Sequence, residues 1–266
     1  ADIERLRGTA AVSVEAGAVG ASEPLPSSWA MVRATAKPGD GLVSRWLNRP
    51  VSQRITWLLL HLPGARPVHV TIFNALLALV MVTMLFVPGG ETGLVLGGIL
   101  FHAASVLDGV DGEMARATWR ASPFGATLDS AVDLATNFLF LAGITVHLAL
   151  RDGDAIGWIG GWAIFIMVTG LPLMAFKLRA DGAPLGFDLL KRWGRLRGPI
   201  DLVYWIVQTL SSRDTYAFLF MVLIIAGLER AALCIFTGVA TLWFAYLLVT
   251  LYRRSARREA GFRGAA

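Results

Sequence analysis

The sequence predicts an all-α membrane protein with six transmembrane helices and an N-terminal amphipathic helix at the membrane surface. First, 55% of the 266 residues are hydrophobic and 16% are charged, whereas a soluble domain carries about 25% charged residues. Second, long uncharged runs recur along the chain, and third, the basic residues gather in alternate connections between these runs. The net charge of +5 therefore favours membrane lipids, and not nucleic acid, as the partner of the basic residues.

Uncharged runs define the predicted spans. Four of them have about the length that a helix needs to cross ~30 Å of hydrocarbon. The run 92–107 spans if its helix continues into the following segment, and 215–228 spans if residues 211–214 lie at the headgroup level. The apolar run 202–210 is too short to cross and is expected at the interface. The predicted spans are 70–87, 92–107, 134–150, 155–176, 215–228 and 231–252.

Lysine and arginine predict the orientation of these spans. The connections between spans one and two, three and four, and five and six contain only Arg151 and Arg230. All other basic residues precede the first span, follow the sixth, or lie in the remaining two connections. The positive-inside rule therefore predicts a multi-pass protein of the cytoplasmic membrane, with both termini and the connection between spans two and three in the cytoplasm.

Composition divides the chain into three predicted parts. Residues 1–36 are rich in Ala, Gly, Ser and Glu, lack a signal peptide, and are interpreted as a poorly ordered linker or the remnant of an upstream segment. Residues 37–258 form the membrane domain, whose spans lie within 68–252, and 259–266 form a tail.

The segment 40–62 is predicted to be a juxtamembrane amphipathic helix. Its apolar residues recur at helical spacing and are set against Arg45, Arg49 and Arg54, which is typical of a helix lying in the headgroup plane. Pro63 ends this helix, and Pro67 begins the first span.

Glycines recur at every fourth position in two places, a spacing that lets helices approach closely. This spacing fits packing within the bundle and it also fits a homodimer interface, so both interpretations stay open, with a homodimer among the expected partners. The glycines are Gly89, Gly93 and Gly97, and Gly153, Gly157 and Gly161.

Four aspartates lie in one segment between uncharged membrane sequences. A single carboxylate at this depth costs about 2.5 kcal/mol or more, and four also repel one another. Arg116 and Arg120 supply at most two positive charges nearby, so a divalent metal site is the simplest explanation. The aspartates are Asp108, Asp111, Asp129 and Asp133.

The spacing of the aspartates supports a metal site. On helices, residues three or four apart share a face, so each pair of aspartates faces one way, and a hairpin through 118–123 brings the pairs together. Oxygen ligands without Cys or paired His favour Mg²⁺ or Mn²⁺ over Zn²⁺, and four carboxylates can hold two ions. Small residues between the aspartates leave room for a ligand, and Arg116 can bind a phosphate oxygen. The sequence therefore predicts a site for a pyrophosphate-containing substrate.

These residues resemble the signature of the CDP-alcohol phosphotransferases, Asp-x2-Asp-Gly-x2-Ala-Arg-x8-Gly-x3-Asp-x3-Asp. The resemblance covers about 37–254, because that family also has six helices and cytoplasmic termini, and it does not reach 1–36. Every fixed position is matched, by Asp108, Asp111, Gly112, Ala115, Arg116, Gly125, Asp129 and Asp133.

The resemblance implies transfer of a substituted phosphoryl group from a CDP-alcohol donor to an acceptor alcohol, with release of CMP. It implies that Asp108, Asp111, Asp129 and Asp133 hold the metal ions. It also implies that Asp133 is the general base that deprotonates the acceptor hydroxyl. The residues implied in binding CDP are Asp108, Asp111, Gly112, Ala115, Arg116, Gly125 and Thr71.

The segment from Lys37 to Ser52 resembles the inositol-phosphate-using branch, which includes di-myo-inositol-phosphate phosphate synthases and phosphatidylinositol-phosphate synthases. An inositol phosphate or another polyol phosphate is then the expected acceptor. By resemblance, its phosphate would bind Lys177, Arg179 and Arg213, although ordinary cytoplasmic anchoring explains the first two equally well. Val68 and Met174 depart from the residues usual at those positions.

Three alternatives remain open at the level of sequence. One is a CDP-diacylglycerol-dependent phosphatidyltransferase of phospholipid synthesis, since sequence does not reveal whether a substrate is a lipid. Another is a cation transporter that uses the aspartates as its ion path, which leaves Arg116 without a role. The third is a non-catalytic scaffold, which the intact motif disfavours.

Overall fold

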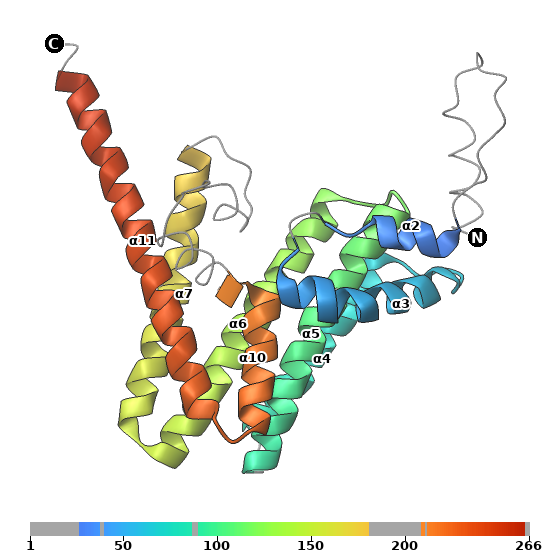
Figure 1. Ribbon diagram of the computed structural model, residues 1–266, viewed down its shortest axis with the longest axis horizontal. Helices are drawn as coiled ribbons and strands as arrows, with labels where there is room; N and C mark the ends of the chain where they lie inside the picture. Colours follow the sequence, from blue (N-terminus) through green and yellow to red (C-terminus); the bar gives the residue numbers. More distant parts are fainter. Residues whose placement is uncertain (1–26, 38–39, 87–89, 181–208, 211, 264–266) are drawn as a thin grey trace.

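The computed structural model describes residues 27–37, 40–86, 90–180, 209–210 and 212–263. In this part of the chain every regular element is helical, which confirms the predicted all-α class (Figure 1). The predicted interfacial run 202–210 lies almost wholly outside the described residues. The elements in chain order are α2 (Ser28–Ala34), the π-helix η1 (Ser44–Asn48), α3 (Arg49–Leu60), α4 (Pro67–Phe86), α5 (Glu91–Ala117), α6 (Pro123–Asp152), α7 (Asp154–Ala180), α10 (Arg213–Ile225) and α11 (Glu229–Arg263).

Five described helices, α4, α5, α6, α7 and α11, are long and apolar enough to cross a membrane. The predicted count of six is not confirmed. The helix at the fifth predicted span, α10, has 13 residues and is therefore about 20 Å long, against about 30 Å of hydrocarbon. It nevertheless lies within the bundle, alongside α5 and α11 (Figure 1).

Helices α5 and α6 extend well beyond the apolar runs that predicted them. α5 continues from its apolar part through Asp108 and Asp111 to Ala117, as the sequence required for a full span. α6 begins at Pro123, eleven residues before the predicted start at 134, because hydrophobicity alone omitted the turns that carry Asp129 and Asp133. Both pairs of aspartates therefore lie on regular helix.

The main core lies between α4, α5, α6, α7, α10 and α11. Phe101 of α5 stacks on Phe140 of α6 with ring centroids 3.8 Å apart, and both side chains are buried. A Cβ added to Gly97 would lie 2.5 Å from Leu85 of α4, so this glycine permits close packing inside the bundle. A homodimer interface at the glycine repeat stays a prediction.

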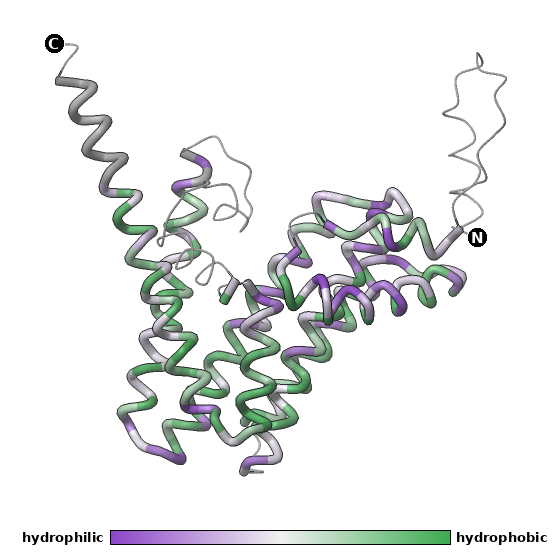
Figure 2. Tube along the Cα trace, viewed as in Figure 1, coloured by the Kyte–Doolittle hydropathy of each residue, from purple (hydrophilic) through white to green (hydrophobic). Residues whose placement is uncertain are grey.

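The N-terminal helices lie across the end of the bundle where α5 joins α6 (Figure 1). Figure 2 shows hydrophilic residues gathered on α2 and α3, above the hydrophobic length of the bundle. α2 was not expected from the sequence. It lies within 1–36, the predicted linker, and its Val32 packs in a small core with Leu60, Val110 and Met114. Residues 1–26 of that linker lie outside the described part.

Candidate active site

The aspartates lie beside the turn that joins α5 to α6. Thr118 caps the C-terminus of α5, and Trp119 then takes a left-handed φ of 55°, which reverses the chain. Ser122 caps the N-terminus of α6: its Oγ accepts a hydrogen bond of 3.0 Å from the N–H of Gly125, with Pro123 in the first turn. This is the hairpin that the sequence predicted.

Three of the four predicted ligands meet in one cluster. Asp108, Asp129 and Asp133 each offer a carboxylate oxygen, and these oxygens all lie within 4.8 Å of one another. All three side chains are partly exposed, so a ligand can reach them. The cluster combines a residue of α5 with two residues of α6, one helical turn apart.

Asp111 is not in that cluster, although it lies on the same helix as Asp108. Its Oδ2 accepts a hydrogen bond of 2.6 Å from Thr71 Oγ1 of α4, and both residues are buried. The structure therefore joins two residues that the family resemblance implied in CDP binding. It places Asp111 at the wall of the site and leaves the other three carboxylates at its centre.

Arg213, at the start of α10, lies against the aspartate cluster. Its Nη1 is 3.2 Å from Asp108 Oδ1 and also forms an ion pair with Asp133. These contacts lack hydrogen-bond geometry, and in the described structure the buried Nε and Nη2 have no hydrogen-bond partner. Arg213 thus offers unused donors beside the carboxylates, which a phosphate oxygen could accept.

Arg116 is held next to the motif glycine. Its Nε donates a hydrogen bond of 2.9 Å to the carbonyl oxygen of Thr35, which follows α2. A Cβ at Gly112 would lie 3.1 Å from Arg116 Nη1, so the guanidinium folds back over this glycine. The predicted room beside Gly112 is therefore taken by Arg116 itself. Ala115 lies half-buried beside it.

Lys177 and Arg179 lie in the last turn of α7, which packs against α6 and α11. Lys177 is buried and Arg179 is exposed. The connection that follows them, 181–208, lies outside the described residues. The role of Lys177 and Arg179 in acceptor binding therefore stays a prediction.

A buried acidic residue, Glu113, was missed at the level of sequence. It is fully buried, and three donors of α3 surround its carboxylate. Arg49 Nη1 lies 2.6 Å from Oε1, while the hydroxyls of Ser52 and Thr56 donate hydrogen bonds of 2.8 Å. The three donors lie on one helical face at intervals of three and four residues, a pattern that marks a polar face of α3 without identifying Glu113 as its partner.

Arg49 is therefore not a headgroup-facing residue, as the predicted surface helix implied. Arg45 and Arg54 are exposed as expected, but the Arg49 side chain is only 12% exposed and also binds Asp40 through Nε and Nη2. Burial opposes ionisation of Asp40, yet the hydrogen bond and charge of Arg49 outweigh it and hold the pKa of Asp40 below its ordinary value. The ion pair is therefore complete at neutral pH.

Asp214 was also missed. Its Oδ1 accepts hydrogen bonds from Asn48 Nδ2 at 2.9 Å and from Ser105 Oγ at 2.8 Å, so it links α10 to η1 and α5. The sequence offered no periodic signal here, because the three residues come from three separate segments. Since Asp214 follows Arg213 directly, these bonds fix the start of α10.

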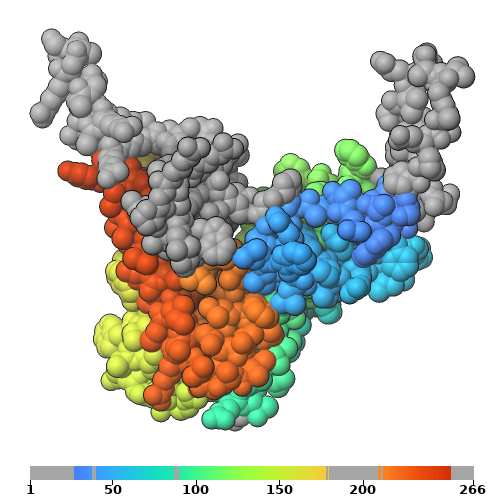
Figure 3. Space-filling model, viewed as in Figure 1, coloured from blue at the N-terminus to red at the C-terminus, as the bar shows by residue number. Residues whose placement is uncertain are grey.

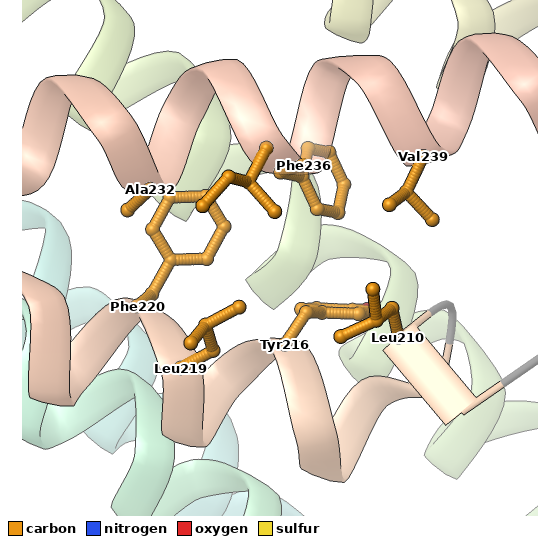
Figure 4. A pocket seen from close by; sticks show the side chains of 8 residues that line it. Leu210, Tyr216, Leu219, Phe220, Ala232, Phe236 and Val239 are labelled. Carbon is orange, nitrogen blue, oxygen red and sulfur yellow. The ribbon is translucent and has the colours of Figure 1, made fainter. Parts of the chain in front are cut away.

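A small apolar cavity lies between α10 and α11, beginning one helical turn from Arg213 (Figure 4). Its wall is built almost entirely from hydrophobic side chains, with Tyr216 at the end nearer the arginine. The lining residues are Leu210, Tyr216, Leu219, Phe220, Ala232, Ile235, Phe236 and Val239.

The fold and the site define a class, a helical membrane protein with a carboxylate cluster at one end of its bundle. Within that class, residues 65–251 match the CDP-alcohol phosphatidyltransferase family, and the chain belongs to this family. The family is generally dependent on divalent metal ions, which agrees with the aspartate cluster.

Several characterised relatives are similar to the chain. It is 32% identical to the bifunctional IPC transferase and DIPP synthase of Aquifex aeolicus over 201 residues, which cover 74% of this chain and 44% of the relative. It is 30% identical to the phosphatidylinositol phosphate synthase of Mycobacteroides abscessus over 159 residues, or 59% of this chain and 70% of the relative. The chain thus spans less than half the length of the bifunctional relative.

Proposed function

We propose that this chain is an integral membrane transferase. It moves a substituted phosphoryl group from a CDP-alcohol to an acceptor alcohol, forms a phosphodiester, and releases CMP. The observation that carries this proposal is the meeting of Asp108, Asp129 and Asp133 beside Arg213, in a chain of this family. The cation-transporter alternative has no comparable support.

The donor set fits Mg²⁺ or Mn²⁺, because it consists of carboxylate oxygens with a single arginine as close counter-charge. Asp108, Asp129 and Asp133 would hold the metal, with Asp111 as a further ligand if it leaves Thr71, and two ions are expected. When bound, the metal would polarise the pyrophosphate and stabilise the CMP leaving group.

The protein groups then have separate roles. Arg116 binds an oxygen of the donor pyrophosphate from above Gly112, and Thr71 holds the orientation of Asp111. Arg213 binds the phosphate of the acceptor through the donors that its ion pairs leave unused. Asp133 takes the proton from the acceptor hydroxyl, because an alcohol is a weak nucleophile until that proton is removed.

An inositol phosphate, or another polyol phosphate, is the proposed acceptor. The unused donors of Arg213 support an acceptor that carries a phosphate. Relatives named IPC transferase and DIPP synthase, and phosphatidylinositol phosphate synthase, support the inositol-phosphate branch. The cytoplasmic membrane, with the site on the cytoplasmic side, is the proposed location, supported by the distribution of lysine and arginine.

A second candidate differs only in the donor, which would be CDP-diacylglycerol. The name of the Mycobacteroides relative, phosphatidylinositol phosphate synthase, refers to a phosphatidyl product and supports this candidate.

CMP release by the purified protein tests both candidates. The protein is given Mg²⁺ or Mn²⁺, inositol phosphate or glycerol phosphate, and one donor at a time: CDP-inositol, CDP-glycerol or CDP-diacylglycerol. We expect CMP only when donor and acceptor are both present. A water-soluble product supports the first candidate, and a product extracted into organic solvent supports the second. No CMP from any combination would contradict the proposed function.

A further inference from the structure

Two consecutive residues, Asn48 and Arg49, connect the N-terminal helices to both sides of the site. They lie at the junction where the π-helix η1 ends and α3 begins. π-helices are rare and frequently occur at functional sites. Consecutive residues of a helix point about 100° apart, so two neighbours can reach two different helices.

Arg49 reaches α5. Its Nη1 binds Glu113, which lies between Gly112 and Arg116 of the motif, and its other nitrogens bind Asp40. A Cβ added to Gly109 would lie 3.2 Å from Arg49 Nη1, so the guanidinium lies against α5 at this glycine. This buried contact fixes how α5 is rotated beneath α3.

Asn48 reaches α10. It is 3% exposed, and its Nδ2 donates to Asp214, the residue after Arg213. Ser105, one turn before Asp108 on α5, donates to the same carboxylate oxygen. Figure 3 shows the N-terminal helices in blue lying against α10 in orange. The start of α10 is thus tied to the same segment that holds α5.

We propose that Asn48 and Arg49 are positioning residues, which together set the distance between the two substrate-binding parts of the site. Arg49 positions the donor part, formed by Asp111, Gly112 and Arg116. Asn48 positions the acceptor part, formed by Arg213. Neither residue touches substrate. The inference rests on the proposed function for the roles of the two parts, but the connection itself is independent of that function.

The kinetic test compares Michaelis constants for donor and acceptor. Asn48→Ala should raise KM for the acceptor about tenfold, because it removes one hydrogen bond to a charged group, and should leave KM for the donor within about twofold. Ser105→Ala removes the other hydrogen bond to Asp214 and should also raise KM for the acceptor.

The donor side is tested with mild variants, since loss of one partner from the buried pair can unfold the protein. Thr56→Val and Ser52→Ala each remove one hydrogen bond to Glu113 and keep its ion pair with Arg49. Both should raise KM for the donor by about three- to tenfold, with little change in KM for the acceptor. Arg49→Gln should raise KM for the donor more than either of these variants.

Arg45→Gln is the matched control for Arg49→Gln, because it removes the same charge from an exposed position on the same segment. It should leave both constants unchanged. Equal changes in KM for donor and acceptor, in both Asn48→Ala and Thr56→Val, would indicate a general loss of stability and overturn the proposal. An increase in KM for the acceptor in Arg45→Gln as large as that in Asn48→Ala would indicate an effect of surface charge and would also overturn it.

A distance measurement distinguishes failure of the positioning role from failure of the proposed function. Spin labels at Leu58 of α3 and Val222 of α10, both exposed, report the separation of these helices in a Cys234→Ser background. Asn48→Ala should broaden the distance distribution, and Arg45→Gln should not. An unchanged distribution in Asn48→Ala overturns the positioning role even if CMP is released. Absence of CMP with the expected broadening contradicts the proposed function alone.

Discussion

The two ends of the helical bundle both carry clusters of charged side chains, but they balance them differently. At the end where α6 joins α7, Arg151 binds Asp152 and Glu229, and Arg230 binds Asp152, so two arginines neutralise two carboxylates. At the other end, the carboxylates of Asp108, Asp129 and Asp133 cluster beside Arg213, which pairs with Asp108 and Asp133. The first set is complete without a ligand, whereas the second requires further positive charge.

This difference separates structural charges from functional ones. Ion pairs near a surface contribute little to stability and cost little to keep. An excess of carboxylates at membrane depth is unfavourable, and it persists only where another group compensates it. The chain therefore balances its charges where they join α6 to α11, and keeps more carboxylates than arginines in the cluster where a metal ion and a diphosphate are expected to bind.

The largest effect is expected from Asp129→Asn in the unbalanced cluster. It removes a proposed metal ligand, so CMP release should fall by about 1,000-fold or more. Initial rates measured with saturating donor and Mn²⁺ check this, with circular dichroism as the control for folding. A rate within tenfold of the unaltered protein would show that the cluster is not the metal site.

Asp133→Asn distinguishes the base from the other ligands. It should retain binding of CDP while turnover falls by about 100- to 10,000-fold, since an amide cannot accept the proton of the acceptor hydroxyl. Calorimetric titration with CDP and single-turnover rates are the measurements. Normal turnover would assign the base to another group.

Thr71→Val should have a smaller effect, because it removes the hydrogen bond to Asp111 and a longer one to the Pro67 carbonyl, and preserves the shape of the side chain. We expect KM for the donor to rise about tenfold, the value of one hydrogen bond to a charged group. Thr83→Val is the matched control on the same helix, since its exposed hydroxyl bonds only to a backbone carbonyl in the described structure. Equal behaviour of the two variants would remove Thr71 from the site.

The smallest effect is expected at the balanced end. Glu229→Gln breaks its ion pair with Arg151 and should lower the melting temperature by no more than about 4 °C, with CMP release unchanged. Thermal unfolding in detergent, followed by the CMP assay at 25 °C, checks both statements. A loss of activity comparable to that of Asp129→Asn would contradict the division between the two ends.

The sequence predicted the residues of the site better than the limits of the helices. Asp129 and Asp133 could be found because residues four apart share a helical face, and the predicted hairpin brought Asp108 to them. The same rule paired Asp111 with Asp108, and it could not show that Asp111 binds Thr71 of another helix. The start of α6 could not be found, because its first turns carry polar residues that a search for apolar runs excludes. The short α10 likewise could not be established as a span.

The contacts that hold the helices around the site could not be predicted from local sequence patterns. Asn48, Ser105 and Asp214 lie in three segments far apart along the chain, and only the folded bundle brings them together. Arg49 was misinterpreted because helical amphipathicity does not distinguish an arginine that faces lipid headgroups from one that faces a buried carboxylate. In both cases the missing information was which neighbouring helix each face contacts.

Binding of Mn²⁺ tests whether the aspartate cluster is a metal site. Its electron paramagnetic resonance signal is titrated with the unaltered protein, with Asp108→Asn and Asp129→Asn, and with Glu229→Gln from the balanced end. We expect saturable Mn²⁺ binding to the unaltered protein and to Glu229→Gln, and an affinity for Mn²⁺ reduced at least about tenfold in both aspartate variants. Equal affinity in all four proteins would contradict a metal site at the aspartate cluster.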